Sequence, residues 1–121
     1  MKKALSDPPI CTNNLIAMQD TLYVLGGKWK LLILHYLMYR EVEINTFKKI
    51  ERDITGISAK MLSKELKDLE INKLVQRTIQ DTKPITVRYS ITAYGKTTKE
   101  IIDNLVDWGK KHRLEILKNH E

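Results

Sequence analysis

The sequence predicts a mainly α-helical domain with one small β-hairpin, an α+β fold. Apolar residues recur at helical spacing in several stretches, and one later stretch alternates as a strand does. The chain has 121 residues, of which 42% are hydrophobic and 30% are charged. This balance is typical of a globular protein, and the length suits a single domain over residues 1–121.

The N-terminal part predicts an arm and two helices. Residues 1–10 are expected to form a flexible arm, because consecutive prolines at positions 8 and 9 oppose helix there. A first helix follows from Asn14 and ends at a pair of glycines, Gly26 and Gly27. A second helix over 28–39 is apolar almost all round, which is typical of the buried centre of a domain.

Residues 43–70 predict two short helices joined by a tight turn at 55–56. Asn45 or Thr46 can cap the first of them, and Ser58 is a good cap for the second, which extends to the end of this segment. Two short helices joined in this way form a helix-turn-helix.

The C-terminal part predicts a hairpin over 74–92 and a long helix over 93–118. The second strand alternates cleanly, with Ile85, Val87, Tyr89 and Ile91 on one side and polar residues on the other. Thr92 can cap the last helix, which carries an apolar stripe. A hairpin directly after a helix-turn-helix is a wing, so the predicted architecture is a winged helix-turn-helix.

The second helix of the helix-turn-helix predicts a nucleic-acid contact. Its leucines fall on one face at about 100° per residue, and three lysines with a serine fall on the opposite face. A helix fits the DNA major groove, where lysine can reach phosphates or guanine, and the adjacent hairpin adds further polar groups. The residues predicted to contact DNA are Ser58, Lys60, Ser63, Lys64, Lys67, Lys83, Thr86 and Arg88.

Other interpretations of these residues remain open at this point. The net charge of +6 favours polyanions, but a lysine stripe can also be an ordinary solvated face. Arg88 can pair with an acidic side chain of a neighbouring element instead of contacting DNA. The helical pattern does not distinguish DNA from RNA, and some winged helices are protein-interaction modules.

Several ordered motifs resemble the HxlR-type family of winged helix-turn-helix regulators, which is MarR-like. The motifs are the segments 25–34, 56–58, Met61-Leu62, 66–70, Leu74-Val75 with Arg77, then Pro84, Val87, Tyr89, Ile91-Thr92, Tyr94-Gly95 and Trp108-Gly109. The resemblance implies a dimeric transcriptional regulator, with its first and last helices at the dimer interface and helix 58–70 in the major groove. It implies double-stranded DNA as the partner, with a pseudo-palindromic operator whose half-sites lie about one helical turn, or a multiple of it, apart.

The resemblance also directs attention to Cys11 and Lys73. Some members use a cysteine near the start of the chain as a thiol switch, and Cys11 is the only cysteine here. It is either such a switch or an ordinary thiol, and the effector, an oxidant or a small molecule, stays open. Lys73 stands where the family usually has glycine after the recognition helix, so Asn72 is expected to take the left-handed conformation that ends this helix.

The sequence does not favour an enzyme. The three histidines, His35, His112 and His120, have no second ligand at metal-binding spacing, and no set of acid, base and nucleophile is recognisable. No cofactor is therefore expected. No apolar run approaches the roughly 20 residues of a membrane span, and the start lacks the apolar region of a signal peptide. A cytoplasmic protein is expected.

Overall fold

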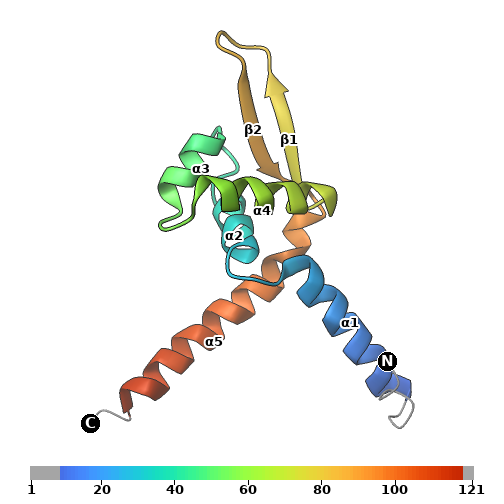
Figure 1. The fold of residues 1–121 in the computed structure, drawn as a ribbon. Helices are drawn as coiled ribbons and strands as arrows, with labels where there is room; N and C mark the ends of the chain where they lie inside the picture. The colour runs from blue at the N-terminus through green and yellow to red at the C-terminus, as the bar shows by residue number, and fades with distance from the viewer. Residues whose placement is uncertain (1–8, 119–121) are drawn as a thin grey trace.

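The computed structural model describes residues 9–118 and confirms the predicted mainly α-helical fold with a winged helix-turn-helix (Figure 1). In chain order the elements are α1 (Pro9–Leu25), α2 (Lys30–Met38), α3 (Phe47–Asp53), α4 (Ala59–Ile71), β1 (Val75–Gln80), β2 (Thr86–Ile91), the short 3-10 helix η2 (Gly95–Thr98) and α5 (Lys99–Lys118). The two strands form one antiparallel hairpin.

Helix α2 lies at the centre of the domain, where it contacts α4, α5 and β2. Neighbours on several sides explain why this helix is apolar almost all round. The apolar side chains that are no more than 2% exposed come from α2, α3, α4, β1 and the residue before β1: Ile33, Leu34, Leu37, Ile50, Leu62, Leu66, Leu69, Leu74 and Val75.

Helix α1 begins at Pro9, so the predicted arm over 1–10 is wrong at its last two positions, and the helix starts five residues before Asn14. Proline is tolerated in the first turn because the amide hydrogen that it lacks would have no partner inside the helix there. The rest of the predicted arm lies outside the described residues. The helix ends before the glycine pair, as predicted, and Gly27 has a φ of +88°.

The end of α4 differs from the prediction. Asn72 keeps an ordinary φ of −85°, and Lys73 takes the left-handed conformation with a φ of +65°. The amide of Lys73 donates to the carbonyl of Glu70 at 3.0 Å, and the amide of Leu74 donates to that of Leu69 at 2.9 Å. This pair of bonds is the Schellman arrangement, which requires the left-handed residue directly after the cap, so position 73 is fixed by geometry although it is not glycine.

The hairpin is in register from Val75 opposite Ile91 to Gln80 opposite Thr86. The predicted alternation of β2 does not appear in its burial, because every residue from Thr86 to Ser90 is half-buried. The segment before α3 explains this difference, since it lies beside β2. The amide of Tyr89 donates to the carbonyl of Asn45 at 2.8 Å.

The predicted last helix starts later than expected. Thr92 does act as a cap, since its Oγ1 accepts a hydrogen bond from the amide of Gly95 at 2.9 Å, but the segment that follows is the 3-10 helix η2. A Cβ atom at Gly95 would collide with the carbonyl oxygen of Leu74. This close approach holds the tight turn against the start of the hairpin, and the regular helix α5 begins only at Lys99.

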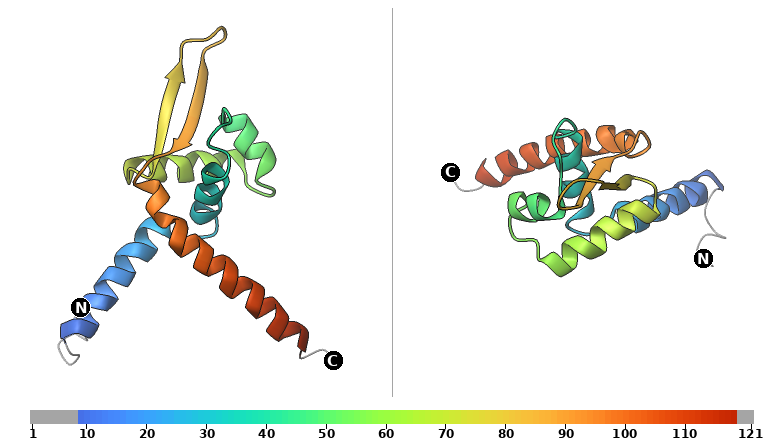
Figure 2. Two further views of the ribbon diagram at one scale, coloured as in Figure 1. Left: turned by 180° about the vertical axis from the view of Figure 1, so that it is seen from behind. Right: turned by 90° about the horizontal axis from the view of Figure 1, so that it is seen from above.

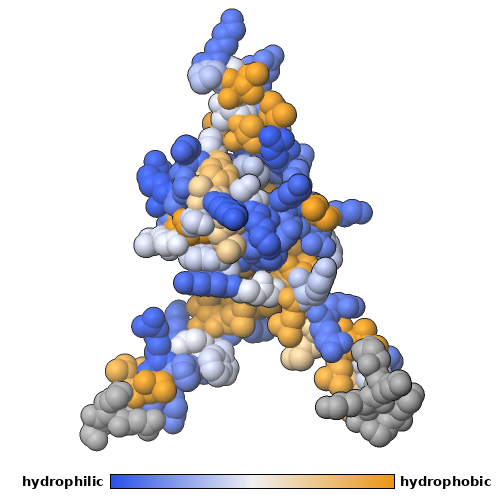
Figure 3. Space-filling model, in the orientation of Figure 1, coloured by the Kyte–Doolittle hydropathy of each residue, from blue (hydrophilic) through white to orange (hydrophobic). Residues whose placement is uncertain are grey.

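Helices α1 and α5 leave the body on the side opposite the hairpin and diverge from each other (Figures 1 and 2). Their exposed apolar residues include Leu15, Met18, Leu22, Tyr23, Leu105, Trp108, Leu114 and Leu117. Apolar surface is visible along both helices in Figure 3. None of the described helices combines the length and the apolar character that crossing a membrane requires.

Candidate DNA-binding surface

Helices α3 and α4 form the helix-turn-helix, and local sequence fixes where each begins. Thr46 Oγ1 accepts a hydrogen bond from the amide of Lys49 at 3.2 Å, and Ser58 Oγ accepts one from the amide of Met61 at 3.1 Å. Both are N-caps, as predicted. Between the helices, Gly56 has a φ of +91°, a conformation that L side chains rarely adopt.

Helix α4 presents two different faces. Leu62, Leu66 and Leu69 are at most 1% exposed and pack into the core. The opposite side carries the exposed residues Lys60, Ser63, Lys64 and Lys67. Hydrophilic side chains accordingly cover the front of the body below the wing (Figure 3). The structure therefore brings together the predicted recognition residues of α4 on one accessible surface.

Two of the three lysines on this face are free of ion pairs within the described residues, and the third is not. Neither Lys60 nor Lys67 forms an ion pair in the range 9–118, whereas Lys64 Nζ lies 3.1 Å from Asp68 and 3.4 Å from Glu65. The two carboxylates raise the pKa of Lys64, Asp68 most, and Lys64 in turn is the main cause of the lowered pKa of Asp68. The sequence pattern predicted three equivalent lysines, but in the structure they differ.

The same two carboxylates contact Lys30 of α2, which sequence analysis missed. Lys30 Nζ lies 2.9 Å from Glu65 and 3.5 Å from Asp68, and its side chain is only 11% exposed. Glu65, which lies between the leucine face and the lysine face in the helical pattern, is 5% exposed. A lysine inside an otherwise apolar helix is the available signal, but its partners are about 35 positions away and their identity is not readable from spacing.

The wing residues that are predicted to contact DNA differ in whether their polar groups already have partners within the protein. Lys83 is exposed in the turn of the hairpin. Thr86 Oγ1 lies 2.9 Å from Thr82 Oγ1 and donates to the carbonyl of Pro84 at 3.3 Å, so this hydroxyl is engaged inside the turn. Arg88 forms no ion pair with any other described residue, and its backbone bridges Thr46 ahead of α3. The interpretation of Arg88 as an ion-pair partner therefore finds no support in the described range.

Comparison with known proteins identifies the family. Residues 24–116 match the family model described as the HxlR-like helix-turn-helix. The chain belongs to the HxlR family. The HTH-type transcriptional regulator YdeP of Bacillus subtilis (strain 168) is 34% identical over 101 residues, which cover 84% of this chain and 77% of YdeP.

Solved structures agree with this assignment. The structure of the HTH-type transcriptional regulator YtcD has a TM-score of 0.72 and 33% identity, and covers 78% of this chain and 94% of that one. The redox regulator HypR in its reduced form has a TM-score of 0.73 and 29% identity, with 85% and 98% covered. The protein is thus a DNA-binding transcription regulator of the HxlR type with a winged helix-turn-helix.

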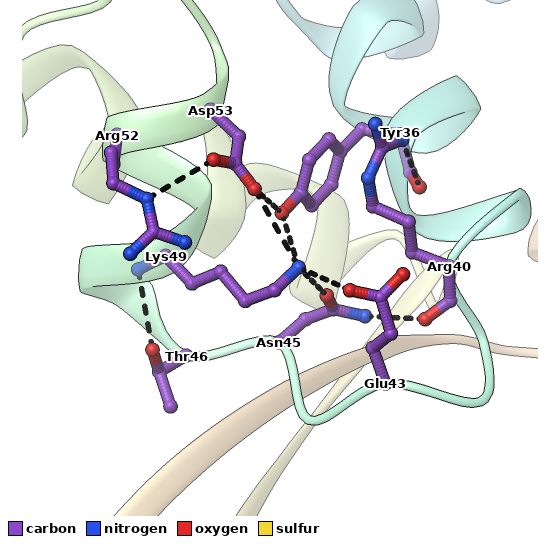
Figure 4. Close-up of polar contacts among 8 residues, drawn as sticks. All are labelled: Tyr36, Arg40, Glu43, Asn45, Thr46, Lys49, Arg52 and Asp53. Atoms are coloured by element: carbon purple, nitrogen blue, oxygen red, sulfur yellow. Dashed lines mark hydrogen bonds and ion pairs between the residues drawn. The ribbon is translucent and has the colours of Figure 1, made fainter.

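In this HxlR-type regulator a polar cluster joins α2, α3 and the loop between them (Figure 4). Lys49 Nζ is its centre, and it lies 2.8 Å from Tyr36 Oη, 2.9 Å from Glu43 and 3.1 Å from Asn45 Oδ1. Tyr36 Oη donates to Asp53 at 2.7 Å. The hydrogen bond from Tyr36 is the main cause of the lowered pKa of Asp53, and the bond to Tyr36 is the main cause of the raised pKa of Lys49. Lys49 therefore acts inside the regulator rather than on its surface.

The cluster also reaches the wing. Asn45 is 1% exposed, its Nδ2 donates to the carbonyl of Arg40 at 2.9 Å, and its own carbonyl accepts the amide of Tyr89 in β2. One buried amide side chain thus holds the loop that carries both the start of α3 and the flank of the wing. The cluster fixes the wing relative to the helix-turn-helix.

Cys11 lies exposed near the start of α1. This end of α1 extends away from the body of the domain, which contains the recognition helix α4 (Figure 1). The part of the chain that the structure describes contains no group of three or more histidine, cysteine or acidic side chains arranged to hold a metal ion.

Proposed function

We propose that this HxlR-type regulator binds double-stranded DNA sequence-specifically as a homodimer, with α4 in the major groove and the wing beside it. The observation that carries the proposal is the exposed face of α4. Lys60 and Lys67 project there without carboxylate partners among residues 9–118, so their charge is available to phosphates. Ser63 lies on the same face and can donate to or accept from a base edge.

The position of the terminal helices supports the homodimer. Helices α1 and α5 carry exposed apolar side chains and extend away from the wing (Figures 1 and 3). Trp108 is 66% exposed and Leu105 is 52% exposed, a degree of exposure that favours burial against a partner. Because these helices lie on the side opposite the wing, pairing through them leaves α4 accessible, and a two-fold dimer matches a pseudo-palindromic operator.

The test of DNA binding is a salt titration with the upstream region of the protein's own gene and a scrambled duplex. The double variant Lys60→Glu/Lys67→Glu should lower the log–log salt slope by about four units per dimer, since two phosphate contacts are lost in each subunit and each lost contact removes about 0.9. Lys110→Glu/Lys111→Glu, an equal charge change at two exposed residues of α5, is the matched control and should leave the slope unchanged when calculated per dimer. Unchanged binding of the double variant at low salt would favour the protein-interaction interpretation.

We also propose that Cys11 links the regulator to oxidants. Its exposure on α1 and the similarity to the redox regulator HypR support this role. Two Cys11 thiols from two subunits would form one disulfide, while an oxidant such as a peroxide accepts the two electrons and two protons. Oxidised and reduced protein should then differ in DNA affinity, and Cys11→Ser should remove that difference. Identical curves for the two states would leave Cys11 an ordinary thiol.

A further inference from the structure

Two carboxylates of the recognition helix share two lysines that differ in exposure. Glu65 and Asp68 both contact Lys30, which is 11% exposed on α2, and both contact Lys64, which is 62% exposed on α4 itself. The four charges sum to zero. The Lys64 ammonium is therefore not a free positive charge at rest, unlike those of Lys60 and Lys67 on the same face.

A phosphate that approaches α4 has to compete with these carboxylates for Lys64. The outcome depends on what Glu65 and Asp68 lose when Lys64 leaves. Glu65 is 5% exposed, and an unpaired carboxylate at such a site is strongly unfavourable. With Lys30 at 2.9 Å, Glu65 keeps its shorter ion pair, and Asp68 keeps one at 3.5 Å.

Lys64 also has room to move. A surface cavity of about 480 Å³ opens beside the four charges, lined by Tyr23, Lys30, Lys64, Asp68, Ile71 and Asn72. Lys30 lines the same cavity, but its side chain is only 11% exposed, against 62% for Lys64, so Lys64 is the lysine that is open to a DNA phosphate. Lys64 can thus leave its ion pairs with Glu65 and Asp68, whereas Lys30 stays paired with both.

We propose that Lys30 is a positioning residue for DNA binding: it remains as the permanent counterion of Glu65 and Asp68 and so releases Lys64 to a DNA phosphate. This inference rests on the proposed function, because it assumes that α4 meets DNA. It assigns a role in DNA binding to a side chain that does not touch DNA. Without Lys30, Lys64 is the one lysine among residues 9–118 that still pairs with Glu65 and Asp68. It then remains in these ion pairs and does not bind a DNA phosphate.

The test is the salt slope of duplex binding in a set of variants. Lys30→Met should lower the slope by about two units per dimer, the same as Lys64→Met, because both remove one phosphate contact in each subunit. The double variant Lys30→Met/Lys64→Met should show no further decrease. Lys67→Met is the matched control, since Lys67 lies on the same face and forms no ion pair among residues 9–118. The decrease of the salt slope that it causes should add fully to the decrease caused by Lys30→Met.

A rescue separates this role from simple loss of structure. In Lys30→Met/Glu65→Gln/Asp68→Asn both carboxylates are gone, so Lys64 is free again and the slope should return to the wild-type value. A purely structural role of Lys30 predicts no such return, and that result would overturn the proposal. So would additive effects of Lys30→Met and Lys64→Met. Circular dichroism and sedimentation of each variant establish that the chains compared are folded and have the same oligomeric state.

Failure of the proposed function is a different result. If neither the wild type nor Lys67→Met shows salt-dependent duplex binding, α4 does not meet DNA and both proposals fall. If wild type binds and Lys67→Met loses about two units of slope per dimer while Lys30→Met loses none, only the role of Lys30 is wrong.

Discussion

Large apolar side chains are buried in the centre of the domain and exposed on its terminal helices. In α2, Ile33, Leu34 and Leu37 are at most 1% exposed. In α5, Ile102 is the one buried residue, and Leu105 and Trp108 are exposed to solvent. Helix α2 is apolar almost all round, whereas α5 carries its large apolar residues among many polar and charged ones. The difference indicates that the body completes its core within one chain and that the terminal helices do not.

The largest expected difference in the free energy of unfolding is between two leucine-to-alanine substitutions, one in each region. Leu34→Ala should lower the free energy of unfolding by about 2–5 kcal/mol, because it leaves a cavity in a closed core. Leu105→Ala should change the stability of the dissociated chain by no more than about 0.5 kcal/mol and should weaken dimerisation instead. Urea unfolding at several protein concentrations, with sedimentation, measures both. Equal losses at low concentration would show that α5 packs within its own chain.

A second contrast lies between two lysines on α3. Lys49 is the centre of the polar cluster in Figure 4, and Lys48 beside it is exposed with no ion pair in the described range. Lys49→Met should lower the free energy of unfolding by about 1–3 kcal/mol, because Tyr36 and Asn45 lose a hydrogen-bond donor in a partly buried site. Lys48→Met is the matched control and should have little effect. A comparable effect of both variants would mean that the cluster does not hold α2 and α3 together.

These contrasts also show what the sequence can predict. The caps Thr46 and Ser58 and the two faces of α4 depend on residues within one helical turn, and their prediction is confirmed. The counterion role of Lys30 depends on a residue 35 positions away, and the cluster around Lys49 depends on a folded loop. The helical pattern also grouped Lys60, Lys64 and Lys67 on one face, although the i,i+4 spacing of Lys64 and Asp68 is a signal in the sequence that Lys64 has a carboxylate partner.

A glycine in place of Lys73, at the end of α4, should increase the stability of the protein. Because a residue with a Cβ atom is disfavoured by roughly 1–2 kcal/mol in the left-handed conformation, Lys73→Gly should raise the free energy of unfolding by about 1 kcal/mol. Lys73→Ala removes the charge and keeps the Cβ atom, so it should leave stability almost unchanged. If the two variants behaved alike, the gain would come from charge rather than backbone conformation. The measurement is urea unfolding at neutral pH.

The smallest expected effect concerns acid stability and the ion pairs of α4. The pKa of Asp68 is below its ordinary value of 3.8, chiefly because Lys64 hydrogen-bonds to the carboxylate. A carboxyl whose pKa is lower in the folded state stabilises that state above the unfolded pKa, and this contribution disappears as the pH falls through the folded pKa. The stability difference between wild type and Asp68→Asn should therefore be complete at neutral pH, begin to shrink near pH 3.8, and disappear only when the pH is below the lowered pKa of folded Asp68.

Asp81→Asn is the control for that experiment, because Asp81 is exposed in the turn of the wing and forms no ion pair with the other described residues. Its unfolding free energy should follow that of wild type from neutral pH to acid. The comparison also bears on the exchange of Lys64. If Asp68→Asn matches wild type at every pH, the pair of Lys64 and Asp68 contributes no stability to the folded protein. Lys64 would then be as available to DNA as Lys60 and Lys67, and a permanent counterion at Lys30 would have nothing to release.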